Sequence, residues 1–397
     1  MATIYESIGV PTIINAKGPS TRVSGGILPA EVAAAMHDAS QHCVDMAALQ
    51  GRASEIIAEI TGAEAGLVTA GAAAGLLLGT AACVTGLDPG KMNRLPTTRG
   101  MKNRVIVPRS HRNFYDHAVR AVGVELVEVG IADRFSGAGV RDTEAWEIDD
   151  AIDEATAAIL YVAQPFALPP LPAVVEVAHR RGVPVIVDAA AQLPPVDNLR
   201  RFTAEGADLV AFSGGKAITG PQASGILCGR RDLIAAAALQ NLDLDVHYDQ
   251  WDPPPSLIDK SKLVGLPQHG IGRSCKVGKE EVVGLLTALR LFVDGGMEGR
   301  QVECRALADE LYQGLRGLAG ASAAPLADCS RPGIPGVSLA PSTMEAGELI
   351  CRLQDGSPPV YADPSRLHEG VVRFDTMCLR PGDPAIIVRG AKAALAE

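Results

Sequence analysis

Aromatic residues make up only 4% of this 397-residue chain, and the signals of several protein classes are missing. The 8 cysteines form no C-x-x-C pair and follow no regular spacing, so the sequence indicates no disulfide framework. His and Cys do not gather at metal-ligand spacing, and we therefore expect no metal. Unpaired thiols are typical of the reducing cytoplasm, which is the predicted location.

Positive charge is also in deficit. Lys and Arg number 36 against 46 Asp and Glu, a net charge of -10, so the counterion-release attraction to nucleic acid has no global basis. The N-terminus lacks a basic region followed by an apolar run, which predicts no secretory signal. The longest weakly polar stretch, about 66–85, lacks the basic flanks and aromatic belt of a membrane span. We expect neither a nucleic-acid partner nor membrane insertion.

Apolar runs and helical patterns alternate between residues 104 and 229. Short runs rich in β-branched residues are predicted to be strands at 104–108, 124–129, 157–163, 183–188, 207–213 and 224–229. Most are continuously apolar, as in strands covered on both faces. Helical patterns between them, such as 111–122 and 172–181, indicate right-handed crossovers. The pattern predicts an α/β fold with an open, mostly parallel sheet.

The flanking segments predict a second, smaller domain. Residues 1–275 are predicted to form an N-terminal arm and a large α/β domain, including a Pro-rich loop at 243–273 that could be a lid or an interface segment. Residues 276–397 are predicted to form bridging helices and a small C-terminal α+β domain. The chain is long enough for both to have a core.

Asp188 and Lys216 are the most informative polar residues. Asp188 ends one predicted strand, and Lys216 follows another through Ser213-Gly214-Gly215. Ligands of open parallel sheets bind at the carboxyl ends of the strands, so both side chains are expected at that edge. Pyridoxal phosphate needs such a pair, because a lysine forms its Schiff base and a carboxylate keeps its ring nitrogen protonated. Taken singly, Asp188 could cap a helix and Lys216 could be a solvated loop residue.

Small residues at 69–75 join a predicted strand to an Ala-rich helix. Such a junction exposes unpaired N–H groups at a helix N-terminus, which is a ready phosphate site. Gly71, Ala72 and Ala73 are therefore candidate phosphate ligands, together with Ser213. By contrast, Gly270-Ile-Gly272 begins like a dinucleotide loop, but it lacks the third glycine and follows no strand.

Several segments together resemble a known group of enzymes. They include Thr69-Ala-Gly71-Ala-Ala-Ala-Gly75, Ser110-His-Arg-Asn113, Val187-Asp-Ala-Ala190, Phe212-Ser-Gly-Gly-Lys216 and Gly272-Arg273. Over nearly the whole chain the sequence resembles the fold-type I pyridoxal phosphate-dependent enzymes, within the group of selenocysteine synthase and D-glucosaminate-6-phosphate ammonia-lyase. The resemblance implies pyridoxal 5'-phosphate as cofactor and a homodimer or higher even homo-oligomer.

The resemblance also implies roles for single residues. Lys216 would carry the cofactor, Asp188 would pair with its ring nitrogen, and His111 would stack on its ring. His111 could instead be a helix-start residue bonded locally. Arg273 would lie at the substrate or phosphate site of its own or a neighbouring subunit, or could be an ordinary charge beside a helix. Candidates for the substrate carboxylate are Arg373 and Arg380.

The reaction that the resemblance favours is β-elimination. After deprotonation at Cα, a hydroxy or sugar amino acid would give a 2-oxo acid and ammonia, which predicts a lyase with a small amino acid substrate. An aldolase or racemase of a β-hydroxy amino acid would use the same residues. Selenium transfer on aminoacyl-tRNA is disfavoured by the acidic balance. A catalytically silent protein that binds the cofactor is the non-enzyme alternative.

Overall fold

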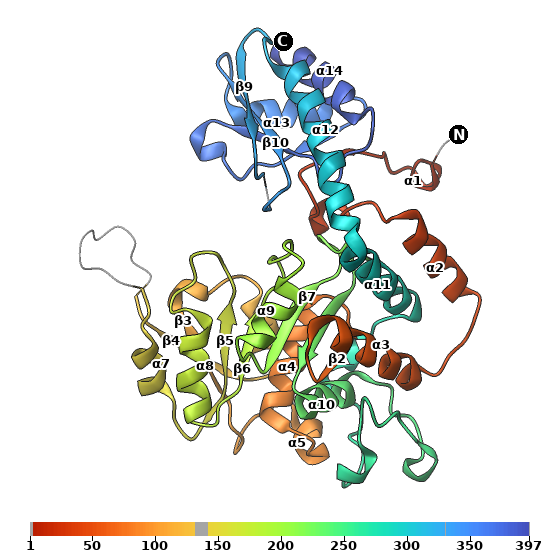
Figure 1. Cartoon of the computed structure of the whole chain (residues 1–397), viewed down its shortest axis with the longest axis vertical. Helices are drawn as coiled ribbons and strands as arrows, with labels where there is room; N and C mark the ends of the chain where they lie inside the picture. Colours follow the sequence, from red (N-terminus) through yellow and green to blue (C-terminus); the bar gives the residue numbers. More distant parts are fainter. Residues whose placement is uncertain (1–2, 132–141, 330, 397) are drawn as a thin grey trace. The chain divides into compact units, whose positions relative to one another are not determined.

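The computed structural model describes residues 3–131, 142–329 and 331–396. The chain divides into two compact units, one of Pro29–Arg290 and one of Met1–Leu28 with Leu291–Glu397 (Figure 1). The contacts thus group the N-terminal arm with the C-terminal segment. The sequence-based division at 275/276, with the arm in the large domain, remains a prediction about folding domains.

A 7-stranded sheet forms the centre of the larger unit. Its strands are β2 (Ala65–Thr69), β3 (Arg104–Pro108), β4 (Glu125–Val129), β5 (Thr156–Val162), β6 (Val185–Asp188), β7 (Leu209–Ser213) and β8 (Gly225–Gly229), in the order β2-β8-β7-β6-β5-β3-β4. From β4 to β7 the neighbours are parallel, whereas β8 is antiparallel to both β7 and β2. The predicted α/β class with a mostly parallel sheet is confirmed.

Burial explains the apolar strand runs. Every residue of β5, β6 and β8 is buried, because helices cover both faces of the sheet. Each of the strands predicted between residues 104 and 229 is present, with boundaries that differ by no more than the usual fraying of strand ends.

The helices of this unit are α2 (Ala30–Ser40), α3 (Met46–Thr61), α4 (Ala72–Thr85), α5 (Pro89–Arg94), α6 (Asp116–Arg120), α7 (Ala145–Ala151), α8 (Leu171–Arg180), α9 (Asn198–Ala204), α10 (Arg231–Asn241) and most of α11 (Lys279–Leu291). The Ala-rich α4 is almost wholly buried and packs against α10. No helix of the described residues is long and apolar enough to cross a membrane.

One predicted helix is wrong. Residues 111–122 do not form a continuous helix, because a 3-10 turn at Arg109–His111 is followed by an irregular step before α6 begins at Asp116. The side-chain oxygen of Asn113 accepts the N–H of Tyr115 at 2.7 Å. Such a local side-chain bond competes with helical hydrogen bonding, so it delays the helix start.

The smaller unit combines two short sheets with three longer helices. Strands β9 (Ala321–Leu326), β10 (Gly336–Pro341) and β12 (Val372–Asp375) form an antiparallel sheet, and β1 (Ile14–Ala16) pairs with β11 (Val360–Ala362). The helices are α1 (Ile4–Ser7), α12 (Met297–Leu315), α13 (Ala346–Asp355) and α14 (Asp383–Ala396). Phe374 lies in its apolar core. This agrees with the α+β order predicted for the C-terminal segment.

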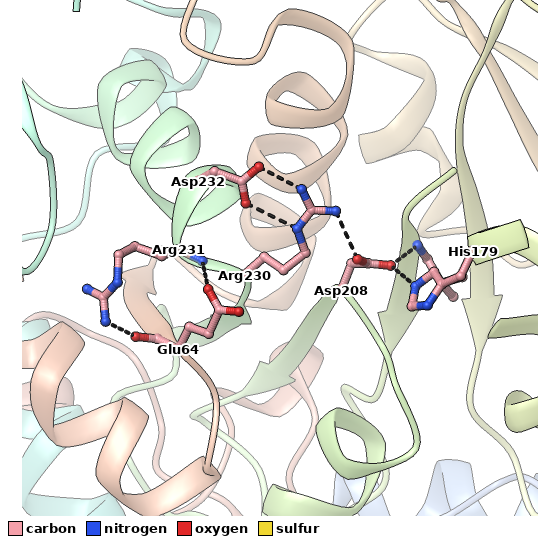
Figure 2. Close-up of polar contacts among 7 residues, drawn as sticks. Glu64, His179, Asp208, Arg230, Arg231 and Asp232 are labelled. Carbon is pink, nitrogen blue, oxygen red and sulfur yellow. Dashed lines mark hydrogen bonds and ion pairs between the residues drawn. The ribbon is translucent and has the colours of Figure 1, made fainter. Parts of the chain in front are cut away.

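A buried carboxylate ties several elements together at the amino ends of the central strands (Figure 2). Asp208 is 5% exposed and accepts hydrogen bonds from the backbone N–H of Val185 at 2.8 Å and from the guanidinium of Arg230 at 3.1 Å. His179 lies 2.8 Å from the same carboxylate. Arg230 also pairs with Asp232, which is 56% exposed. Asp208 therefore connects α8, β6, β7 and the segment before α10.

Replacing Asp208 tests this connection. Asp208→Ala leaves the buried N–H of Val185 without its partner, so we expect the free energy of unfolding to fall by about 2–3 kcal/mol. The matched control is Asp232→Ala, which removes only an exposed partner of Arg230 and should cost less than about 1 kcal/mol. Urea unfolding of both variants checks this, and equal losses would contradict the assigned role.

Candidate functional site

Asp188 lies at the carboxyl end of β6, where it is 7% exposed. One of its carboxylate oxygens accepts the N–H of Ala190 at 3.0 Å. Burial raises the pKa of Asp188, while the N–H of Ala190, the positive charge of Lys216 and the side-chain amide of Asn113 act to lower it. The structure thus brings Lys216 within electrostatic range of Asp188, as the strand order predicts.

The turn that carries Lys216 is held by its own backbone. The N–H of Gly214 donates to the carbonyl of Ser224 at 2.9 Å, and the N–H of Gly220 donates to the carbonyl of Gly214 at 2.9 Å. A Cβ atom at Gly214 would lie 2.3 Å from Oγ of Ser224, and one at Gly215 would lie 2.7 Å from Cα of Gln222. Both glycines are therefore required by the packing of the turn itself.

His111 lies at the end of β3 and is 2% exposed. Its Nδ1 atom accepts the N–H of Val162 at 3.3 Å, and its ring contacts Tyr161 edge-on with a centroid distance of 4.8 Å. Burial lowers the pKa of His111 to about 4, so the imidazole is neutral at pH 7 and its proton is on Nε2. That buried Nε2 atom makes no hydrogen bond of normal geometry among the described residues, although the backbone of Leu168 lies close enough to act on the pKa of the ring. Since Val162 pairs with Asp188, the imidazole reaches the strand beside that carboxylate.

The start of α4 is an uncapped helix N-terminus. Gly71 precedes it with φ 102° and has no side chain that could cap it. The carbonyl of Gly71 accepts the N–H of Gly75 at 3.1 Å. The N–H groups of Ala72 and Ala73 consequently have no intrahelical acceptor. A Cβ at Gly71 would meet no atom within 4 Å, so there is open space in front of the turn.

Strand register places Ser213 beside this turn. Ser213 pairs with Gly225 on β8, and Gly225 pairs in turn with Thr69 on β2, which leads into the turn. A Cβ at Gly225 would lie 2.5 Å from the carbonyl carbon of Gly71, so β8 supports the turn directly. Ser213, Lys216 and the N-terminus of α4 therefore share one edge of the sheet.

The donor set at this edge fits a phosphorylated pyridine aldehyde. The uncapped N–H groups suit a phosphate, and the ring of His111 is buried and neutral. Burial disfavours the charged form of Asp188, and a protonated ring nitrogen beside the carboxylate would offset that cost. The residues predicted for the cofactor are thus neighbours in the fold.

The three predicted substrate arginines have different surroundings. Arg273 is half-buried and pairs with Asp243 at 2.6 Å. Arg373 is 12% exposed and pairs with Asp363 at 3.3 Å. Arg380 is exposed, and among the described residues it has no ion pair. Arg373 and Arg380 both belong to the smaller unit.

Sequence reasoning assigned no role to Asn113, although it is the last residue of the segment Ser110-His-Arg-Asn113. Its side-chain oxygen accepts the N–H of Tyr115, which leaves its NH2 group to act on Asp188. Only its position in the segment that follows the end of β3 at Pro108 could have signalled this role.

The fold is that of the fold-type I pyridoxal phosphate-dependent enzymes. The solved structure of D-glucosaminate-6-phosphate ammonia-lyase matches with a TM-score of 0.81 and 28% identity, covering 100% of this chain and 99% of that one. A cysteine desulfurase from Thermococcus onnurineus shares the fold with a TM-score of 0.53 and 15% identity, covering 100% of this chain and 99% of that one. The predicted fold class is confirmed.

The chain belongs to the family described as "SelA: L-seryl-tRNA selenium transferase", which matches residues 48–250. A 5'-C-glycyluridine monooxygenase-decarboxylase from Streptomyces is 32% identical, covering 99% of this chain and 92% of the relative. The D-glucosaminate-6-phosphate ammonia lyase of Salmonella typhimurium is 30% identical, with 97% and 96% covered. An L-seryl-tRNA(Sec) selenium transferase from Nitratidesulfovibrio vulgaris is 27% identical, with 86% and 70% covered. The resemblance inferred from the sequence is confirmed.

The buried state of His111 predicts a pH effect on stability. The folded pKa is lowered to about 4 from 6.5, so between these values the unfolded chain binds a proton that the folded chain does not. Folding should therefore lose stability as pH falls from 6.5 to 4, by about 3 kcal/mol from this residue. His111→Gln should flatten the slope of unfolding free energy against pH in this window, and an unchanged slope would contradict the neutral state.

Proposed function

We propose that this protein is a pyridoxal phosphate-dependent lyase that eliminates a β-substituent from a hydroxy or sugar amino acid, giving a 2-oxo acid and ammonia. The observation that carries the proposal is that the charge of Lys216 acts on the buried carboxylate of Asp188 at the sheet edge that also holds the uncapped start of α4. The similarity to an ammonia lyase over 97% of this chain supports the reaction class.

The cofactor supplies an electron sink for the pair of electrons left at Cα of the substrate. Asp188 would hold a proton on its ring nitrogen, and the amides from Gly71 to Ala73, with Ser213, would bind its phosphate. The neutral imidazole of His111 would stack on its ring. Lys216 would attach the cofactor and, once released, would move the proton at Cα of the substrate.

Arg380 is the better candidate for the substrate carboxylate. The guanidinium of Arg373 pairs with Asp363 and donates to the carbonyl of Cys329, so it is partly held by the fold, although its Nε atom makes no hydrogen bond of normal geometry among the described residues. Arg380 is exposed, and its side chain forms no ion pair among the described residues. A charged donor without a partner can bind a carboxylate without breaking an existing bond.

The proposal extends to the assembly, the location and the domains of the protein. We propose that the protein acts as a homodimer or higher even homo-oligomer in the cytoplasm, on a small-molecule amino acid and without a nucleic-acid partner. We also propose that residues 1–275 and 276–397 are its folding domains. The acidic composition, with 46 Asp and Glu against 36 Lys and Arg, supports the absence of a nucleic-acid partner.

Other reactions would use the same residues. Aldol cleavage and racemisation start from the same Cα chemistry, and selenium transfer is named for relatives that are 27% identical. The 32% identical relative is a monooxygenase-decarboxylase, which makes an oxygen-dependent reaction the second candidate. A catalytically silent protein would bind the cofactor without turnover.

Loading the protein with pyridoxal phosphate tests the role of Lys216. The bound cofactor should absorb near the visible edge, and borohydride reduction should fix it to Lys216, identified by peptide mass. Lys216→Ala should lose this attachment and lower kcat by about 10²- to 10⁴-fold, because the proton at Cα loses its base. A Lys216→Ala protein with full turnover would overturn the mechanism.

A substrate panel then identifies the reaction. D- and L-serine, threonine and phosphorylated amino sugar acids should be assayed for 2-oxo acid, ammonia and oxygen uptake. The lyase proposal expects 2-oxo acid and ammonia in equal amounts with no oxygen uptake. Glycine with an aldehyde would indicate an aldolase, inversion alone a racemase, and carbon dioxide with oxygen uptake a monooxygenase-decarboxylase.

The two arginines of the smaller unit should behave differently. Arg380→Ala should raise KM by roughly 10- to 100-fold through loss of a charged hydrogen bond, with little change in stability. Arg373→Ala should instead lower the free energy of unfolding by about 2 kcal/mol, because the partly buried carboxylate of Asp363 loses its cation and keeps only its hydrogen bonds from Ser365. Arg366→Ala, at an exposed arginine of the same unit, is the control and should change neither quantity. Normal KM in Arg380→Ala would exclude this residue.

A further inference from the structure

The residues after β3 reach the strand that neighbours Asp188. The Nδ1 atom of His111 accepts the N–H of Val162, the last residue of β5, at 3.3 Å. Val162 is the register partner of Asp188 on β6, and the N–H of Ala163 donates to the carbonyl of Asp188 at 2.9 Å. Since Asn113 is two residues beyond His111, this hydrogen bond brings the segment that carries Asn113 to the carboxyl end of β6.

Arg112 fastens the same segment on its other side. Its Nε atom donates to the carboxylate of Asp116 at 2.5 Å, and its Nη1 atom donates to Glu128 of β4. The side chain of Asp116 is 5% exposed and also accepts the Nε atom of Arg120 at 3.1 Å. A charged hydrogen bond to a buried carboxylate holds its donor more firmly than an exposed ion pair does. The backbone on the amino side of Asn113 is therefore held against β4 and α6.

The backbone that follows orients the side-chain amide of Asn113. Its Oδ1 atom accepts the N–H of Tyr115 at 2.7 Å, and its main-chain carbonyl accepts the N–H of Asp116 at 3.3 Å. A side-chain oxygen bonded to the backbone two residues on is the arrangement of an Asx-turn. Because the N–H of Tyr115 requires an oxygen acceptor, the positions of the oxygen and the NH2 group are determined. The NH2 group is thus a donor with one direction.

The carboxylate of Asp188 receives that NH2 group. Burial raises the pKa of Asp188, and the hydrogen bond from Asn113 acts against burial, as do the N–H of Ala190 and the charge of Lys216. The N–H of Ala190 is local backbone, and Lys216 has its own part in the proposed reaction. The amide of Asn113 is a side-chain donor to Asp188 that no other step of that reaction uses.

We propose that Asn113 is a positioning residue that keeps the carboxylate of Asp188 charged and fixed in orientation, so that this carboxylate can hold a proton on the ring nitrogen of the cofactor. The inference rests on the proposed function, because the pairing of Asp188 with that nitrogen belongs to it. A carboxylate that takes up the proton itself leaves the ring nitrogen neutral, and a neutral ring is a weaker electron sink. Asn113 therefore acts through Asp188.

A cofactor analogue without the ring nitrogen tests the inference without turnover. Pyridoxal phosphate, and the analogue in which CH replaces its ring nitrogen, should each be titrated into the full chain freed of cofactor, and each Kd measured from the change in absorbance. The wild type should bind pyridoxal phosphate more tightly, because only this ligand places a cation beside Asp188. In Asn113→Ser the preference should fall by about tenfold, as expected for the loss of a hydrogen bond to a charged group. The Kd of the analogue should not change.

Serine is chosen because it keeps the local turn. Its hydroxyl can accept the N–H of Tyr115, but its shorter side chain carries no NH2 group for Asp188. The matched control is Asn103→Ser, because Asn103 is half-buried like Asn113, precedes the amino end of β3 and donates to Thr98 at 3.5 Å. This control should leave both Kd values unchanged. Asn113→Ala, which also loses the turn, should show the same fall in preference and a lower free energy of unfolding.

Turnover gives a second readout. In the cofactor-loaded protein, Asn113→Ser should lower kcat by roughly tenfold and leave KM within about twofold, because the electron sink is weakened and substrate binding is not. Asn103→Ser should change neither quantity. A residue that only supported the fold would lower the free energy of unfolding without this division between kcat and KM.

The outcomes separate this inference from the proposed function. If the wild type prefers pyridoxal phosphate and both Asn113→Ser and Asn113→Ala keep the full preference, the role of Asn113 is overturned and the lyase proposal stands. A raised KM with unchanged kcat in Asn113→Ser overturns that role as well. A wild type that binds both ligands equally overturns the pairing of Asp188 with the ring nitrogen, and the inference with it. A preference that depends on Asn113, without turnover on the whole substrate panel, overturns the lyase proposal alone.

Discussion

The burial of a single carboxylate, that of Asp188, is the constraint on which the site depends. A carboxylate in this position is costly unless positive charge and hydrogen-bond donors oppose its desolvation. The N–H of Ala190, the charge of Lys216 and the amide of Asn113 do so. The N–H of Ala190 comes from the turn directly after Asp188, whereas Lys216 and Asn113 belong to other segments, which the parallel register of β3, β5, β6 and β7 brings to the same edge.

The central sheet holds a second buried carboxylate at its opposite edge, and its hydrogen-bond partners differ from those of Asp188. Asp208 receives the N–H of Val185, the guanidinium of Arg230 and the imidazole of His179, so its surroundings are complete and its role is structural (Figure 2). Asp188 accepts the N–H of Ala190 and interacts with the amide of Asn113 and the charge of Lys216, and no arginine or histidine pairs with it among the described residues. A buried acid with fewer strong partners than Asp208 can still take up a donor from a ligand.

The surroundings of the glycines show which of them are required by packing within the protein. In the sequence, Gly214 and Gly215 precede the predicted Schiff-base lysine, and Gly270 with Gly272 begin a false dinucleotide pattern. In the structure all four lie against neighbouring chain segments that a Cβ would displace. Gly71 differs, since a Cβ there would meet open space. Of these five glycines, only Gly71 has room in front of it, and it lies at the proposed phosphate site.

The sequence by itself determined the α/β alternation, the strand ends that carry Asp188 and Lys216, and the small-residue turn, since apolar periodicity and short motifs are local. The tertiary structure decided what depends on distant neighbours. Residues 111–122 do not form one helix, Arg373 pairs with Asp363, and the side chain of Gln240 accepts the N–H of Ile271. Those outcomes arise from contacts across the fold, which no local pattern encodes.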